Sequence, residues 1–105
     1  MGVVETGIFK PWTRFTKQNV QKVSEVYGVY EIANAAKETI YIGSGKLRSR
    51  LLAHFPRAPD PIVGASYFRY EKTGSLERAR QRERALLKEY KRKHGKLPKF
   101  NQKIV

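Results

Sequence analysis

Two short runs of the sequence each carry a tyrosine that could take part in chemistry. They are Gly-Val-Tyr at 28–30 and Tyr-Ile-Gly at 41–43, which mirror each other and are separated by ten residues. The phenols of Tyr30 and Tyr41 could hydrogen-bond to water or phosphate and pass on a proton. An ordinary β-hairpin that packs two tyrosines would give the same pattern, so both interpretations stay open from these residues alone.

A carboxylate on the last predicted helix, 76–93, stands out by its position. At about 100° per residue, one largely apolar stripe of this helix collects Leu76, Ala79, Leu86, Leu87, Tyr90 and His94. Glu83 falls in the middle of that stripe, whereas Glu77 and Glu89 lie to either side of it. Because a buried carboxylate needs a cation or strong donors, Glu83 is predicted either to form an internal salt bridge or to act as a metal ligand or perturbed acid.

A second predicted helix, 47–55, offers two further polar groups. Arg50 and His54 are four residues apart and therefore share one side of this helix, beside an apolar line at 47, 51 and 55. Both could point into the same cleft as Glu83. Arg50 could equally be the salt-bridge partner of Glu83, and His54 could be a packed or surface histidine.

These side chains together match the needs of phosphodiester hydrolysis. A carboxylate can hold Mg²⁺ against a phosphate, and an arginine can stabilise charge on phosphoryl oxygens. A phenol or an imidazole can move a proton from water. Spacing alone does not establish the activity, because scattered polar residues of these types occur in most sequences.

The pattern of elements that would position these groups predicts a small α+β domain. Thr16 caps a short helix to residue 23, and strands at 28–33 and 39–43 form a hairpin. A Gly-Ser-Gly run at 43–45 is expected to end the second strand in a sharp turn. The helix 47–55 stops at Pro56, and a proline-rich loop leads to a strand at 65–72 and the last helix.

Charge is the strongest signal in the composition. The chain has 105 residues, one domain by length, with 22 Lys and Arg against nine Asp and Glu, a net charge of +13 and a pI near 10.3. Such a charge attracts polyanions, and nucleic acid is the expected partner. A membrane surface is the rival, but the aromatic residues lie in strand-like segments and not along a basic helix.

Several classes of protein are excluded by what the sequence lacks. There is no cysteine, which rules out disulfides and thiolate zinc sites. No apolar run is long enough to span a membrane, and the first residues do not follow the plan of a signal peptide. A cytoplasmic protein that makes no contact with a membrane is therefore expected.

The tyrosine runs and the residues that follow them closely resemble the signature of the GIY-YIG nuclease superfamily. After the second run come Arg50 on a helix, His54 one turn later, Glu83 on a later helix, and a Pro-Lys-Phe-Asn stretch at 98–101. The resemblance covers about 26–101, with 1–25 as an N-terminal extension that includes the short helix. It implies a three-stranded antiparallel sheet flanked by helices, with the site on one face of the sheet.

The resemblance also implies a role for each residue of the site. Tyr30 would contact or deprotonate the attacking water, and Tyr41 would line the site and bond to water or phosphate. Arg50 would stabilise the transition state. His54 occupies a position where members carry His or Tyr and would assist proton transfer or contact phosphate.

Two more positions follow from the same resemblance. Glu83 would be the single metal-binding carboxylate, holding one Mg²⁺ or Mn²⁺ per site. Asn101 would brace the site or touch phosphate, although the stretch between it and Glu83 is longer than in repair-type members. Ser44 stands where some members carry a lysine, and Lys46 could substitute for that lysine only if its side chain reaches the site.

Nucleic-acid contacts are expected from six basic residues, Lys46, Arg48, Arg57, Arg80, Arg84 and Lys88. Four aromatic residues could stack on bases or, as is usual in strands, pack in the core: Trp12, Tyr67, Phe68 and Tyr70.

The sequence therefore predicts a divalent-metal-dependent endonuclease that acts on DNA, with branched and damaged DNA among its candidate substrates. The alternative is a non-catalytic nucleic-acid-binding module or a subunit of a DNA repair or restriction assembly. A lone site cuts one strand at a time, so a double-strand break would require a second copy of the chain or a partner protein.

Overall fold

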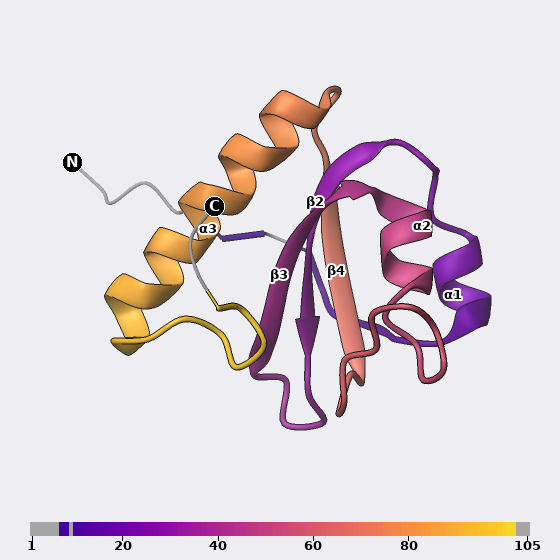
Figure 1. The fold of residues 1–105 in the computed structure, drawn as a ribbon, viewed down its shortest axis with the longest axis horizontal. Coiled ribbons are helices and arrows are strands. Elements are labelled where there is room, and N and C mark those ends of the chain that lie inside the picture. Colours follow the sequence, from indigo (N-terminus) through magenta and orange to yellow (C-terminus); the bar gives the residue numbers. More distant parts are fainter. Residues whose placement is uncertain (1–6, 9, 103–105) are drawn as a thin grey trace.

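A four-stranded antiparallel sheet forms the middle layer of the molecule (Figure 1). The computed structural model describes residues 7–8 and 10–102, so the first six residues of the expected N-terminal extension lie outside the described part. The strands are β1 (Thr13–Arg14), β2 (Tyr27–Ala33), β3 (Thr39–Lys46) and β4 (Tyr67–Lys72), in the spatial order β1-β4-β2-β3. The helices α1 (Lys17–Gln21) and α2 (Leu47–Leu52) cover one face, and α3 (Leu76–His94) covers the other.

The α+β class predicted from the sequence is confirmed, and the sheet has one strand more than the three predicted. The additional strand, β1, has only two residues and pairs Thr13 with Phe68 and Arg14 with Tyr67 at the edge of β4. A two-residue strand has no alternation to detect, so its pairing depends on β4, more than fifty residues later in the chain. The two neighbouring pairs, β2 with β3 and β2 with β4, form the hairpin and third strand that the sequence predicted.

The Gly-Ser-Gly run at 43–45 does not form the predicted turn. It continues β3, where Gly43 is opposite Tyr30 and Gly45 is opposite Gly28, and the strand leads directly into α2 at Leu47. Gly43 serves packing instead, because a Cβ there would lie 2.5 Å from the Tyr30 Oη. Gly45 has a φ of +140° and lies against the aliphatic part of Arg50.

Alternation along β2 divides the core between the two faces of the sheet. Tyr30 and Ile32 pack with Leu47 and Leu51 on the side of α2. Val29 packs on the side of α3, in a second cluster with Ile8, Ile42, Leu86 and Leu87. Val29 and Tyr30 are therefore committed to opposite layers, and a shift of one residue in the register would exchange them.

Helix α3 begins at Leu76 as predicted and ends at His94, one residue later than predicted, and both of its ends are capped. The Ser75 side chain accepts a hydrogen bond from the Arg78 N–H, and Gly95 ends the helix with a φ of +75°. Helix α2 ends at Leu52, earlier than predicted, with Ala53 as its C-cap. Within residues 7–8 and 10–102, no helix is both long enough and apolar enough to cross a membrane.

Candidate active site

Tyr30, on β2, is fully buried and forms a hydrogen bond with His54. Its Oη lies 2.6 Å from Nε2 of His54, and its ring crosses Gly43 of the neighbouring strand, where only a glycine leaves room for it. Burial raises the pKa of the Tyr30 phenol well above its usual value, and the neighbouring Tyr41 adds to the rise. The phenol therefore holds its proton at neutral pH.

His54 follows the end of α2, and the contacts of its two ring nitrogens set the direction of this hydrogen bond. Its Nδ1 lies 2.8 Å from the backbone oxygen of Asp60, and that oxygen can only accept, so Nδ1 carries the imidazole proton. Nε2 is then the acceptor, and the Tyr30 hydroxyl donates to it. Burial lowers the pKa of His54, whereas the Asp60 carbonyl and carboxylate oppose that shift.

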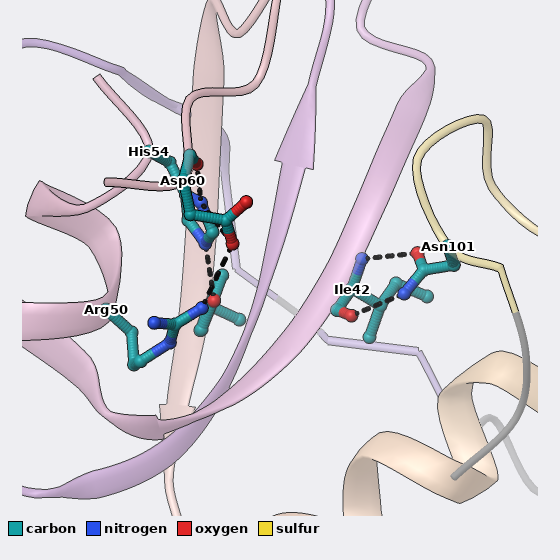
Figure 2. Close-up of polar contacts among 6 residues, drawn as sticks. Ile42, Arg50, His54, Asp60 and Asn101 are labelled. Atoms are coloured by element: carbon teal, nitrogen blue, oxygen red, sulfur yellow. Dashed lines mark hydrogen bonds and ion pairs between the residues drawn. The ribbon is translucent and has the colours of Figure 1, made fainter. Parts of the chain in front are cut away.

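Arg50 lies beside this pair and forms an ion pair with Asp60. Its Nη2 is 3.3 Å from Oδ2 of Asp60, and both side chains are partly exposed (Figure 2). The same Asp60 carboxylate lies 3.7 Å from Nδ1 of His54. Burial favours the neutral form of Arg50, but Tyr30, Tyr41 and Asp60 outweigh it and raise the pKa of the guanidinium. Arg50 is thus a charged, partly exposed group beside the Tyr30–His54 pair.

Tyr41, on β3, is half-buried and lies near His54 and Glu83. Its ring meets the His54 ring edge-on at 5.1 Å and lies 6.1 Å from the Tyr30 ring. Burial raises the pKa of its phenol, and the negative charge of Glu83 contributes next. Of the two phenols that the sequence predicted, Tyr41 is therefore the one that solvent reaches in this structure.

Glu83 is buried on α3, as helical periodicity predicted, with 9% of its surface exposed. The Ser44 hydroxyl donates a hydrogen bond to its Oε1. Burial raises the pKa of the carboxyl, and the Ser44 bond and the nearby Arg80 and Arg50 offset part of that rise. The alternative that Arg50 serves as its salt-bridge partner is not favoured, because Arg50 is paired with Asp60.

The donor set around Glu83 suits a hard divalent cation held by few protein ligands. Among the described residues there is no group of three or more His, Cys, Asp or Glu side chains that could hold a metal. Mg²⁺ commonly keeps several waters and uses one or two carboxylates, whereas a structural zinc site needs four nitrogen or sulfur ligands. A single carboxylate that is oriented by a neutral serine fits the first case and not the second.

Asn101 braces β3 from the side, apart from Arg50 and His54 (Figure 2). Its Oδ1 accepts from the Ile42 N–H and its Nδ2 donates to the Ile42 carbonyl, both at 2.9 Å. The side chain thus pairs with the edge strand as another peptide group would. Of the two roles that the resemblance implied, the geometry corresponds to bracing and not to contact with phosphate.

The six basic residues expected to contact nucleic acid are all exposed: Lys46, Arg48, Arg57, Arg80, Arg84 and Lys88. Arg80 and Arg84 are close enough to Glu83 to lower its pKa, so they flank the carboxylate on α3. Lys46 lies over the Tyr27 ring, 4.6 Å from its centre, and no contact brings it to Glu83 among the described residues.

The four aromatic residues that could stack on bases differ in their burial and in their contacts. Phe68 is buried in the core, as the packing interpretation requires. Tyr67 and Tyr70 are half-buried, and Tyr70 stacks on Phe68 with ring centres 6.2 Å apart. Trp12 is half-buried, and the guanidinium of Arg69 stacks on it, with Cζ of Arg69 4.0 Å from the centre of the Trp12 ring.

Two residues that contact the site were not predicted as part of it. Asp60 comes from the proline-rich loop after α2, and nothing in the local pattern there indicates a contact with Arg50 or His54. For Ser44, the sequence predicted only that it stands where some GIY-YIG members carry a lysine. Its place on β3 opposite Val29, which turns it towards α3, could have been inferred from strand alternation had the run at 43–45 been assigned to the strand.

Comparison with known families gives one match. The model of DUF7508, a domain of unknown function, matches residues 7–93. The chain belongs to this family. The matched range includes both tyrosine runs, α2 and Glu83, and ends before Asn101. No curated protein and no solved structure matches the chain. The membership carries no activity with it, so the GIY-YIG resemblance stays a prediction.

Proposed function

We propose that the chain is a divalent-metal-dependent endonuclease that hydrolyses DNA phosphodiester bonds and works in the cytoplasm. The observation that carries the proposal is the chain of hydrogen bonds from Tyr30 through His54 to Asp60. It gives a buried phenol a neutral base to which its proton can move. Arg50 lies beside this chain, and Glu83 is close enough to Tyr41 and Arg50 for their charges to interact. The resemblance to GIY-YIG nucleases supports the assignment of all four groups.

In the proposed reaction, Tyr30 passes a proton from water to His54. The water oxygen forms a bond to phosphorus while its proton moves to the Tyr30 Oη and the phenol proton moves to Nε2 of His54. The bond to the leaving oxygen breaks, and that oxygen takes a proton from solvent. The products are a phosphomonoester and a free hydroxyl, and the imidazolium is stabilised by the Asp60 oxygens near Nδ1.

Arg50 would bind the phosphate on which this water acts. In the structure its guanidinium is paired with the Asp60 carboxylate, an anion in the position that a phosphoryl oxygen would take. Substrate binding therefore requires the phosphate to displace Asp60 from Arg50. Since Tyr30 is fully buried, we expect this displacement to open the path of water to its oxygen, beside the half-buried Tyr41.

Glu83 would hold the metal, oriented by the Ser44 hydroxyl on Oε1. A Mg²⁺ or Mn²⁺ ion bound there would act as a Lewis acid towards a phosphate oxygen. Because Ser44 is neutral, it orients the carboxylate without offsetting its negative charge. A lysine, which some GIY-YIG members carry at this position, could offset that charge. Arg80 and Arg84 beside Glu83, with Lys46, Arg48, Arg57 and Lys88, would contact the phosphates of neighbouring nucleotides.

One observation favours a non-catalytic nucleic-acid-binding module as the second candidate. Tyr30 and His54 are both fully shielded from solvent, and a buried tyrosine–histidine hydrogen bond can simply stabilise a core. The basic surface would bind nucleic acid in either case. A subunit of a larger repair or restriction assembly is a variant of this candidate, in which a partner supplies the chemistry.

Nicking of nucleic acid distinguishes these candidates. Supercoiled plasmid, single-stranded DNA, branched DNA and RNA are incubated with the protein and Mg²⁺, Mn²⁺ or EDTA. We expect metal-dependent nicking of DNA, and we expect Glu83→Ala to lower the nicking rate by at least about 100-fold. The matched control is Glu77→Ala, an exposed carboxylate on the same helix, which should keep full activity. Tight, salt-sensitive binding without nicking in any metal would establish the binding module instead.

A further inference from the structure

A hollow lies on the opposite face of the sheet from Tyr30. It has a volume of about 1000 Å³ and is bounded by the end of the β2–β3 hairpin, the C-terminal half of α3 and the segment before β1. Aromatic rings line it at Trp12 and Tyr90, and the Tyr90 ring stacks on His94 with centres 4.1 Å apart. We call this hollow the α3 groove.

The floor of the α3 groove holds a carboxylate that the proposed reaction does not use. Glu31, on β2, is 6% exposed and accepts a hydrogen bond at Oε1 from Nε of Arg69, at 2.6 Å. Among the described residues no hydrogen bond reaches its Oε2. Burial raises the pKa of the carboxyl, and the Arg69 guanidinium offsets part of that rise. A buried acceptor atom thus faces a cavity without a partner in the described part of the chain.

The rim of the α3 groove is predominantly basic, although the carboxylates Glu38 and Glu89 also line the groove. Lys37, Lys96 and Lys99 line it and are exposed. The anionic groups of an acidic peptide or of inorganic phosphate would meet the rim favourably, but they are acceptors and would give the Oε2 of Glu31 no donor. The three features together suit a ligand with an anionic group, a flat ring and an N–H donor on the ring edge.

A nucleotide with an exocyclic amino group has all three. Its phosphate suits the lysines, its base can stack on Trp12 or Tyr90, and its amino group can donate to a carboxylate. Cytosine presents such an amino donor, whereas thymine and uracil present a carbonyl oxygen in its place, which a carboxylate repels. The volume of the groove is ample for one nucleotide.

We propose that the α3 groove binds one nucleotide of a nucleic-acid strand, with Glu31 Oε2 accepting from the exocyclic amino group of its base. The site is separate from the Tyr30–His54 chain and does not rest on the proposed hydrolysis. Tyr90 is seven residues beyond Glu83 on α3, about 10 Å along the helix, so the nucleotide read here differs from the one that is cut.

The single tryptophan of the chain makes this proposal testable without any assay of cleavage. Trp12 lines the α3 groove, so its fluorescence reports directly on the groove. The protein is titrated in EDTA with CMP, UMP, inorganic phosphate and a glutamate-rich peptide. We expect saturable quenching by CMP, with at least about fivefold weaker binding of UMP. Glu31→Gln should remove this preference.

Control variants separate the groove from the proposed active site. Glu38→Gln changes an exposed carboxylate of the groove rim and should keep the preference for CMP. Glu83→Ala should also leave CMP quenching unchanged, even if it abolishes nicking. The proposal is overturned if CMP and UMP quench equally in the wild type, if phosphate or the acidic peptide quenches as strongly as CMP, or if CMP causes no saturable change. The wild-type titration decides this even if Glu31→Gln fails to fold.

Discussion

The chemistry proposed for this chain depends on one protonation state at His54. The residue must be neutral to accept from the Tyr30 hydroxyl, and its burial and its bond to the Asp60 carbonyl both bear on that state. Periodicity on α2 predicted that His54 shares a side with Arg50, but it gave no sign that the ring is fully buried. That burial results from contacts with β2 and with the loop around Asp60, which are distant in sequence.

The neutral His54 should make stability depend on pH in the mildly acidic range. Its folded-state pKa lies below the ordinary 6.5, so as pH falls the unfolded chain takes up a proton first. The stability that the neutral ring confers is complete above pH 6.5 and declines below it, until pH reaches the folded-state pKa. The decline is at most about 1.4 kcal/mol per pH unit.

Urea unfolding of wild type and His54→Gln, at about pH 7.5 and about pH 5.5, measures this effect. The wild type should lose more stability than the variant between the two conditions. His94→Gln, which changes an exposed histidine, should retain the wild-type pH dependence. Equal losses in wild type and His54→Gln would show that His54 is not held neutral by the fold.

At the scale of elements, β3 is the strand on which the proposed site depends. It carries Tyr41, Gly43 and Ser44 and forms one edge of the sheet. Its outer side is not left bare, because the Phe100 N–H donates to the Ile40 carbonyl and Asn101 pairs with Ile42. The C-terminal segment therefore protects an edge that would otherwise expose unpaired backbone groups next to the candidate site.

Loss of the Asn101 side chain should loosen this edge. Asn101→Ala removes both bonds to Ile42, and we expect a loss of about 1–2 kcal/mol in the free energy of unfolding. Amide hydrogen exchange at Ile42 should also become faster. Gln102→Ala, which changes an exposed neighbour, is the matched control and should alter neither quantity. Unchanged exchange at Ile42 in Asn101→Ala would contradict a bracing role.

Which elements could be predicted follows from how local their signals are. The ends of α3 have their caps within the helix, at Ser75 and Gly95, and Glu83 could be assigned to its buried face from periodicity alone. The run at 43–45 belongs to β3, although the sequence predicted a turn there because glycine is common in turns. Here Gly43 is required by the ring of Tyr30 on another strand, a contact that no local window contains.

At the scale of the whole molecule, the charge of +13 should make nucleic-acid binding strongly dependent on salt. Each cation that contacts a phosphate adds about 0.9 to the slope of log K against log salt on duplex DNA. Arg80→Ala should therefore reduce that slope by about 1 in EDTA. Arg92 is exposed and paired with Glu89, so Arg92→Ala should leave the slope unchanged.

Fluorescence anisotropy of a labelled duplex over a range of salt concentrations measures these slopes. Equal slopes for wild type and Arg80→Ala would show that Arg80, beside Glu83, makes no contact with a phosphate. Such a result would leave the proposed hydrolytic chemistry untouched, because that chemistry depends on Arg50 and not on Arg80.

The most direct test of the central claim is the single-turnover rate of DNA nicking by Arg50→Ala beside Arg48→Ala. Both variants remove one arginine from α2, but Arg48 is exposed, whereas Arg50 is half-buried beside the Tyr30–His54 pair and forms an ion pair with Asp60. We predict that Arg50→Ala slows the Mg²⁺-dependent rate by about 100- to 1000-fold at saturating protein, and that Arg48→Ala changes it less than about threefold. Equal rates for the two variants, or no metal-dependent nicking by the wild type, would contradict the proposal that this site hydrolyses phosphodiesters.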